Sequence, residues 1–390
     1  MLAGFEWGWD NARALLGIAV IFAIAWGLSE NRKAFPWKIV LGSVAIQFAF
    51  ALILFGIPIV RDALFAANKV VDGLIAATAY GTEFVFGPIF GTQAGWEAFT
   101  GQPGPIFAVH LLPLIIVVAS LSAVLWHWHI LRWVTKGFAS VFRRFMGLGG
   151  ATSLAVAANV FMGMTEAPIL IKPYIKGMLL AASLIAAPAA VALALVMVPE
   201  TVDETQRAHE PDFEYDSTMD AFSTGTSDGL KIIANIVTML IAAFAALYLV
   251  NLGLGALPDF GGVPLSIERI LGWIFAPVMY MIGVPFGEAA QAGSLMGIKT
   301  VLTEFVAFLQ LSGEAAEGLS PRARMITAHA ICGFANFGSI GILLGGLSII
   351  EPTRRSTFLE LAWKTLLAGT LATCISGAIV GALPFQLFAH

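Results

Sequence analysis

Long apolar runs separated by short clusters of charge restrict the fold of this chain more than any other feature of its sequence. Of its 390 residues, 58% are hydrophobic and only 12% are charged, whereas soluble domains carry roughly 25% charged residues. Runs of about 20 apolar residues can span a bilayer as helices, and the ~10-residue alternating segments of a membrane barrel do not occur. The sequence therefore predicts an all-α polytopic membrane protein.

The apolar runs and the polar stretches between them predict an order of elements. Spanning helices are expected at 14–28, 37–57, 105–125, 177–198, 230–254 and 361–383, and 264–282 either spans or lies near the surface. An amphipathic helix pair at the interface is expected at 61–90, a loop at 91–104 and a solvated acidic loop at 200–228. Tryptophans followed by basic residues at 126–144 predict an interfacial helix on the cytoplasmic side.

Composition also bears on the function classes. The net charge of -4 and the lack of a basic, aromatic-interleaved patch argue against nucleic acid as a partner. Cys332 and Cys374 are the only cysteines, so no disulfide framework or metal quartet is available. His127 and His129 would face apart on a helix, which favours interface residues over a metal pair. Without a Gly-x-Ser-x-Gly or His-Glu-x-x-His motif, an enzyme is disfavoured.

The stretch 158–168, Ala-Asn-Val-Phe-Met-Gly-Met-Thr-Glu-Ala-Pro, places a carboxylate inside an apolar run. Glu166 in hydrocarbon costs at least ~2.5 kcal/mol, so intramembrane carboxylates are functional by default. Gly163 and Pro168 weaken the helix at this depth, and a broken helix survives there only where protein or water covers it. Basic residues on both flanks of 148–174 predict a re-entrant hairpin, and the break reads as a binding site for a polar solute.

A second stretch of the same kind follows at 293–308, with Glu304 as the carboxylate and Lys299 five residues before it. The glycine-rich segment 328–341 after it predicts a span that is unwound near its middle. There Asn336 and Ser339 lie three apart on one helical face, as a solute-binding pair or as a polar clamp between helices. Two broken, carboxylate-bearing segments in corresponding halves predict a secondary transporter with inverted repeats. No arginine sits within either break, which favours a neutral solute over an anion.

Three ordered motifs in these stretches resemble those of the concentrative nucleoside transporters. They are Gly-Met-Thr-Glu-Ala-Pro at 163–168, Gly-Ile-Lys-Thr-Val-Leu-Thr-Glu-Phe-Val-Ala-Phe at 297–308 and Phe-Ala-Asn-Phe-Gly-Ser at 334–339. The resemblance covers about residues 10–385, and within the family the chain is similar to the bacterial members. It implies an inner-membrane homotrimer that takes up nucleosides with Na⁺ or H⁺ by alternating access, with no covalent chemistry.

The resemblance also implies roles for individual residues and parts of the chain. Met164, Thr165 and Glu166 would contact the base. Glu304, Asn336 and Ser339 would contact the ribose, and Phe334 would line the pocket. Asn159 and the backbone of Met162 would bind Na⁺. The expected parts are scaffold-type and interfacial helices at 1–145, a shortened first hairpin repeat with the acidic loop at 146–228, a scaffold helix and a surface helix at 229–288, and the second hairpin repeat at 289–390.

Four departures from the family pattern affect these expectations. Met164 stands where the family has a glutamine, Thr303 where it has an asparagine, and Gly338 where it has a serine. The fourth is larger: the unwound span that follows the first hairpin is not found after Lys176, a shortage of ~25–40 residues. The alternative prediction is therefore a member that binds nucleoside without coupled transport. A channel is disfavoured because isolated carboxylates in broken helices suit a closed site.

Overall fold

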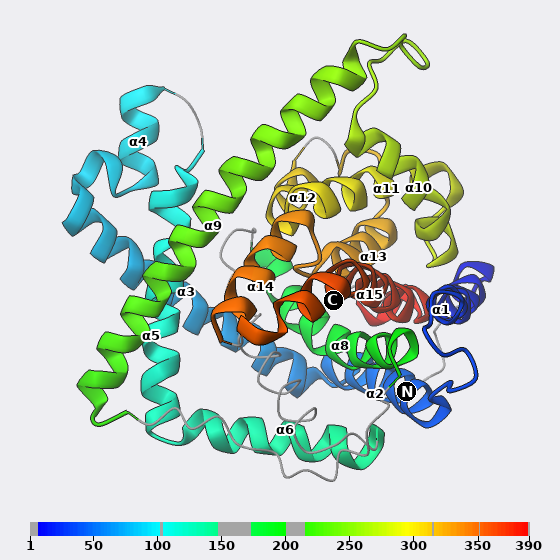
Figure 1. Ribbon diagram of the computed structural model, residues 1–390, viewed down its shortest axis with the longest axis horizontal. Helices are drawn as coiled ribbons and strands as arrows, with labels where there is room; N and C mark the ends of the chain where they lie inside the picture. The colour runs from blue at the N-terminus through cyan, green and yellow to red at the C-terminus, as the bar shows by residue number, and fades with distance from the viewer. Residues whose placement is uncertain are drawn as a thin grey trace.

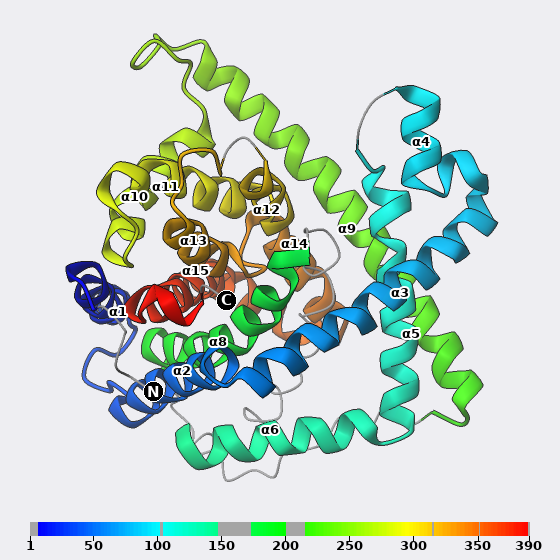
Figure 2. The same ribbon diagram turned by 180° about the vertical axis from the view of Figure 1, so that it is seen from behind.

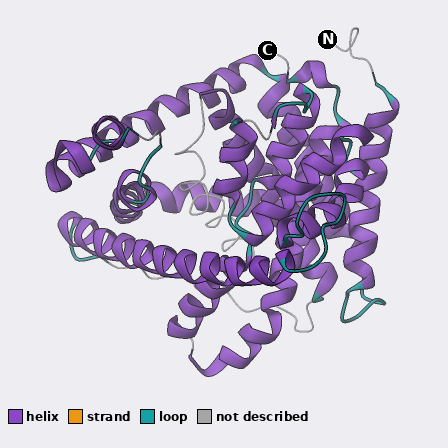
Figure 3. Cartoon of the chain, turned by 90° about the horizontal axis from the view of Figure 1, so that it is seen from above, coloured by secondary structure: helices purple, strands orange, loops and turns teal. Residues whose placement is uncertain are grey.

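The computed structural model describes residues 7–101, 104–146, 173–199, 215–313, 316–350 and 352–388, and the regular elements in these ranges are helices (Figure 3). They are α1 (Trp9–Gly27), α2 (Trp37–Gly56), α3 (Pro58–Phe90), α4 (Gln93–Thr100), the π-helical turn η1 (Phe107–Leu111), α5 (Pro113–His127), α6 (Ile130–Met146), α8 (Pro173–Met197), α9 (Thr218–Gly255), α10 (Ile267–Met281), α11 (Phe286–Val301), α12 (Glu304–Ser312), α13 (Pro321–Ile331), α14 (Phe337–Ile350), η4 (Pro352–Arg354), α15 (Arg355–Ala382) and η5 (Phe385–Leu387). Within the described ranges, six segments are long and apolar enough to cross a membrane: Trp9–Gly27, Trp37–Gly56, Asp72–Thr100, Phe107–His127, Thr218–Gly255 and Arg355–Ala382. The predicted all-α polytopic fold is confirmed.

The helices form two groups that lie side by side (Figures 1 and 2). The first group contains α3, α4, α5 and α9. In it α5 and α9 pack closely, because Gly225 lets the backbones meet: a Cβ there would lie 2.7 Å from the carbonyl oxygen of Ala119. The second group, α1, α2, α8 and α10 to α15, shares one continuous apolar core. Helix α6 runs along one edge beneath both groups.

Contacts between helix ends define one side of the molecule. The amide of Glu30, after α1, donates to the carbonyl of Met197 at the end of α8 (3.0 Å), and the Glu30 carboxylate forms an ion pair with Lys364 near the start of α15. Basic residues gather at this side, in the loop after α1, at the start of α15 and on α6: Arg32, Lys33, Arg132, Lys136, Arg143, Arg144, Arg354 and Arg355. By the positive-inside rule this side is cytoplasmic.

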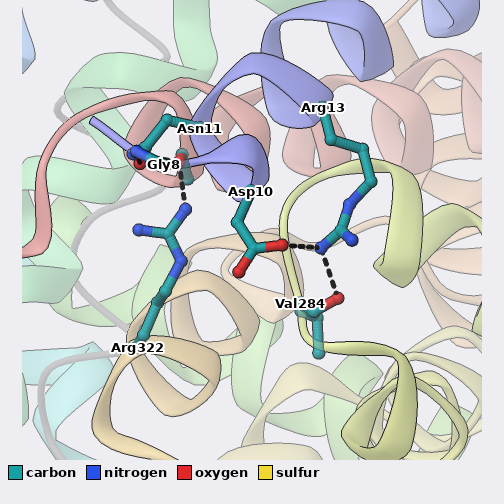
Figure 4. Close-up of polar contacts among 7 residues, drawn as sticks. Gly8, Asp10, Asn11, Arg13, Val284 and Arg322 are labelled. Atoms are coloured by element: carbon teal, nitrogen blue, oxygen red, sulfur yellow. Dashed lines mark hydrogen bonds and ion pairs between the residues drawn. The ribbon is translucent and has the colours of Figure 1, made fainter.

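The first turn of α1 fastens the opposite side (Figure 4). Asn11 donates through Nδ2 to the carbonyl of Gly381 (3.1 Å), one of the last carbonyls of α15, which have no partner within their own helix. Arg13 is buried, pairs with Asp10 at 2.9 Å and donates to the carbonyl of Val284 at 2.9 Å. These bonds tie α1, α15 and the loop between α10 and α11 together on the outer side.

Two predicted loops are wrong in part, because helix caps lie inside polar stretches. Within 91–104 the structure has α4, which begins after Thr92, whose side chain accepts from the Gly95 amide, and ends at Gly101 in the left-handed region (φ 67°). Within 200–228 it has the first turns of α9, where Ser217 accepts from the Asp220 amide at 3.1 Å. An acidic residue in the first turn is stabilised by the helix dipole, so the end of the acidic run is helical.

Two further predictions concern segments of uncertain span. The expected helix pair at 61–90 lies in α3, where non-helical backbone at Gly87 (φ 78°), just before Pro88, separates two helical parts. Together with α4, its second half is long and apolar enough to cross a membrane by length and composition, so the position of the predicted pair at the interface stays a prediction. The segment 264–282 contains α10 with 15 residues, which is about 22 Å of helix and shorter than a ~30 Å hydrocarbon core.

Candidate solute-binding site

Glu304 lies at a break between two helices, as the sequence predicts. Helix α11 ends at Val301, Leu302 leaves the helical region (φ -93°, ψ -99°), and Glu304 is the first residue of α12. Thr303 caps α12, because its side chain accepts from the amide of Val306 (3.4 Å). The Glu304 side chain is 7% exposed. A carboxylate at this position is stabilised by the unpaired amides and the dipole of the helix N-terminus.

Asn336 joins this carboxylate to a second helix N-terminus. Its Nδ2 donates to Glu304 Oε2 at 3.2 Å, and its Oδ1 accepts from the Ser339 amide at 2.8 Å and from Ser339 Oγ at 2.9 Å. Asn336 therefore caps α14, which starts at Phe337, while α13 has already ended at Ile331. The predicted unwinding of 328–341 is confirmed, and it brings the N-termini of α12 and α14 to one amide–carboxylate pair.

Two cavities open onto this pair from different directions. One has a volume of about 380 Å³ and lies within the second helix group, walled by α8, α14 and α15. The other, of about 90 Å³, lies between the two groups, with η1, α5 and α9 on one side and α12 and α14 on the other. Both are mostly apolar and share Glu304, Phe334, Asn336 and Ser339. A few polar groups in an apolar cavity are the usual make-up of a small-molecule site.

Lys299 brings a buried positive charge close to the carboxylate. It lies in the last turn of α11, where a cation is stabilised by the helix C-terminus, and its side chain is fully buried. Its Nζ has no hydrogen-bond partner among the described residues, but it is within Coulombic range of Glu304, Cys332 and Cys374. Among the described residues, charges of opposite sign thus flank the break.

The four candidate residues that the structure describes come together, and the sequence missed several neighbours. On α15, Thr365, Gly369 and Thr373 line the larger cavity at spacings of four residues. A stripe of small and polar residues on one face of an apolar helix was the signal that could have found them. From the first helix group, Phe107 and Met239 line the smaller cavity, and nothing in their apolar context distinguishes them from packing residues.

The remaining candidate residues lie outside the described ranges. They belong to the predicted first hairpin: Asn159, Met162, Met164, Thr165 and Glu166. Among the residues that the structure does describe, no group of three or more histidine, cysteine or acidic side chains could hold a metal ion. The nearby His110 has a structural role, because its Nδ1 accepts from the Ile106 amide (2.8 Å) and its Nε2 lies 2.9 Å from the carbonyl oxygen of Phe90.

A polytopic helical fold with a polar site at two helix breaks defines the class of membrane transporters. Comparison with known families identifies the transporter family. Residues 178–381 match the family model of the Na⁺ dependent nucleoside transporter C-terminus, and residues 16–89 match that of its N-terminus. The chain belongs to the Na⁺ dependent nucleoside transporter family. It is therefore a transporter and not an enzyme, and a multi-pass protein of the inner membrane, as the sequence predicts.

Individual relatives agree with this assignment. An uncharacterized transporter of Haemophilus influenzae is 36% identical, covering 94% of this chain and 96% of the relative. The nucleoside permease NupC of Helicobacter pylori is 30% identical with the same coverage, and human sodium/nucleoside cotransporter 1 is 30% identical, covering 94% of this chain and 63% of the relative. The structure of CNTnw in an inward-facing, substrate-bound state has a TM-score of 0.82 at 32% identity and covers 97% of this chain and 98% of its own.

Proposed function

We propose that this protein takes up nucleosides across the membrane by alternating access, driven by a sodium gradient. The observation that carries the proposal is the Glu304–Asn336 pair, buried where two helix N-termini meet and open to two cavities. Two relatives support it by their names, a nucleoside permease and a sodium/nucleoside cotransporter. Structures similar to this chain have been solved in inward-facing and outward-facing states.

The chemistry of the pair suits the hydroxyls of a sugar. In its ionised form the Glu304 carboxylate only accepts hydrogen bonds, so it takes them from ribose hydroxyls, and Asn336 and Ser339 add groups that can donate as well as accept. Phe334 offers a ring face at the wall that both cavities share. Contacts of Met164, Thr165 and Glu166 to the base and of Asn159 and Met162 to Na⁺ stay predictions, since these residues lie outside the described ranges.

The smaller cavity supports movement of one helix group against the other. Its walls come from both groups, with Leu112 and Met239 facing Glu304 and Gly338. If the second group slides past the first, the polar pair is carried with it while the walls of this cavity separate. We propose the boundaries 1–145, 146–228, 229–288 and 289–390 for the parts of the chain. Within 1–145, helices α1 and α2 would move with the second helix group, because they share its apolar core. We also propose that the protein assembles as a homotrimer.

Transport by purified protein in liposomes tests the proposal. With an inward sodium gradient, radiolabelled uridine should accumulate above its external concentration, and a matched potassium gradient or collapse of the sodium gradient should reduce uptake to equilibrium. A proton gradient in place of sodium distinguishes H⁺ coupling. If no cation gradient drives accumulation although uridine equilibrates or binds, the coupling part of the proposal is wrong.

The length of the chain favours a second candidate, a member that binds nucleoside without coupling. The alignment to the Haemophilus relative spans 413 positions but covers only 94% of 390 residues, about 367, so about 46 positions have no residue of this chain. That is enough for one membrane span with its loops. For this candidate, calorimetry should give the same uridine affinity with and without sodium, and liposomes should show no accumulation.

A further inference from the structure

Helix α6 lies at the cytoplasmic edge of the molecule and joins its two helix groups. Its second half packs onto α2 and α8 through Phe138, Ala139 and Met146, which cluster with Ile46 and Val191. Its first half follows α5, and the corner between them contacts the start of α9, where Trp128 Nε1 donates to Thr218 Oγ1 at 3.2 Å. The basic residues Arg143 and Arg144 lie in its last turn. An amphipathic helix with this charge distribution lies in the plane of a membrane surface.

The first half of α6 carries a small cationic cavity. His129, Arg132, Trp133 and Lys136 line it and enclose about 180 Å³. Lys136 follows Arg132 by four residues and Trp133 by three, which places the three on one face of the helix, and His129 lies directly before its first residue. Arginine and lysine supply two permanent charges and histidine can supply a third, while none of the described lining residues is acidic.

Contacts of Arg132 and His129 position two of the residues that line this cavity. The Arg132 guanidinium lies over the ring of Trp126, with Cζ 5.7 Å from its centroid. Its Nε is buried and has no hydrogen-bond partner among the described residues. His129 adopts a left-handed conformation (φ 65°), rare for a residue with a side chain, and its carbonyl accepts from the Trp133 amide (3.1 Å). Rarely adopted backbone conformations of this kind tend to occur at functional sites.

The residues around the cavity suit the binding of a lipid headgroup. Trp128 and Trp133 are 55% and 79% exposed, and exposed tryptophans mark the headgroup depth of a bilayer. The apolar side chains Ile130 and Val134 are exposed on the same half of the helix and would lie against acyl chains. Arginine binds phosphate through paired hydrogen bonds, and basic pockets on the cytoplasmic side of membrane proteins hold anionic lipid headgroups.

We propose that the cavity of His129, Arg132, Trp133 and Lys136 binds the phosphate headgroup of an anionic phospholipid in the cytoplasmic leaflet. A bound lipid would hold the corner between α5 and α6 at the membrane surface. The second half of α6 would stay attached to α2 and α8. The site is separate from the solute site, since it shares no lining residue with either cavity at Glu304.

Native mass spectrometry of the full-length protein tests this proposal. Dioctanoyl phosphatidylglycerol and dioctanoyl phosphatidylcholine are titrated separately onto delipidated protein, with inorganic phosphate as a third arm. Phosphatidylglycerol should bind at least tenfold more tightly than phosphatidylcholine, and rising salt should weaken it because the attraction is electrostatic. Equal affinity for the two lipids would overturn the proposal, and displacement of phosphatidylglycerol by millimolar phosphate would assign the cavity to a free anion instead.

A double variant, Arg132→Gln with Lys136→Gln, should lose the preference for phosphatidylglycerol. The matched control is Lys231→Gln on α9, an exposed lysine in an ion pair with Asp228 (2.9 Å) outside the cavity, which should keep the preference. If the double variant does not fold, Arg132→Lys retains the charge but not the planar guanidinium and should weaken the binding of phosphatidylglycerol severalfold. Unchanged selectivity in a folded variant would show that the lipid binds elsewhere.

Discussion

Replacement of Glu304 by glutamine tests the assignment of the solute site most directly. The substitution keeps the size of the side chain and leaves one oxygen to accept the 3.2 Å hydrogen bond from Asn336 Nδ2. It removes the negative charge at the N-terminus of α12. The folded protein should therefore lose the interaction of that charge with the helix dipole, about 0.3–1 kcal/mol, and also its attraction to the buried Lys299 ammonium.

The effect on binding should be larger, because the ligand contacts the charge itself. Hydrogen bonds to a charged group contribute about 1.5–3 kcal/mol, against 0.5–1.5 kcal/mol for neutral partners. Two ribose hydroxyls that donate to Glu304 would each lose about 1–1.5 kcal/mol in Glu304→Gln. The dissociation constant for uridine should then rise roughly 30- to 150-fold.

The chain offers a matched control for this experiment. Glu268, early in α10, also accepts hydrogen bonds from an asparagine side chain, Asn251 Nδ2, at 3.0 and 3.2 Å, and it lines neither cavity at Glu304. Calorimetry with uridine should give wild-type affinity for Glu268→Gln and weakened affinity for Glu304→Gln. A Glu304→Gln protein that binds uridine as tightly as the wild type would remove Glu304 from the site.

Three other substitutions give distinct outcomes. Arg13→Met removes an ion pair, a hydrogen bond to a backbone carbonyl and a ring contact, so thermal unfolding should show a loss of about 1–3 kcal/mol with uridine affinity unchanged. Lys299→Met removes a buried ammonium that has no hydrogen-bond partner among the described residues, so the melting temperature should not fall. Uridine should nevertheless bind severalfold more weakly, because Glu304 loses its nearby cation. In Gly225→Val the added Cβ would lie 2.7 Å from the α5 backbone, so α9 must move away and the melting temperature should fall. Gly253→Val, where an added Cβ meets nothing within 4 Å, should leave the melting temperature unchanged.

The second half of the site could be predicted because its residue types are unusual for a bilayer. A carboxylate, an asparagine and several glycines within apolar runs are costly unless they serve a site, so Glu304 and Asn336 stood out. Thr365 and Gly369 of α15 did not, because threonine and glycine also occur at ordinary contacts between membrane helices. The lining from the first helix group is apolar, and tertiary packing alone brings it to the site.

Helix ends were less predictable than the site. Thr92 and Ser217 each cap a helix, yet each lies in a polar stretch that has the composition of a loop. Since a cap depends on one side-chain hydrogen bond to a nearby amide, its position is local and does not change the average polarity of the segment. Five of the six spans predicted from long apolar runs correspond to helices long and apolar enough to cross a membrane, because hydropathy is a property of the whole segment. The sixth, 177–198, lies in α8, in which Leu184–Met197 counts as a shorter apolar helix.

The described helix ends place Met146 on the cytoplasmic side of the membrane and Pro173 on the outer side. Helix α6 ends beside the cytoplasmic end of α2, where a Cβ on Gly42 would lie 2.6 Å from the carbonyl oxygen of Phe145. Helix α8 also ends on the cytoplasmic side, at the bond between the Met197 carbonyl and the amide after α1. With 25 residues, α8 is about 37 Å long, so its first residue lies on the outer side.

These two positions bear on the predicted hairpin at 148–174, nearly all of which lies outside the described residues. A re-entrant hairpin returns to the side from which it enters, so the 26 residues between α6 and α8 would have to form the hairpin and also a crossing that alone needs about 20 residues. Three relatives align with about 39 to 46 positions that have no residue of this chain, which is the length of one further span with its loops. The sequence predicts that the missing span would follow Lys176, after the predicted sodium ligands Asn159 and Met162. If the shortage lies there, we expect it to weaken coupling to sodium more than binding of the solute, because Glu304 and Asn336 form their contact within the described residues.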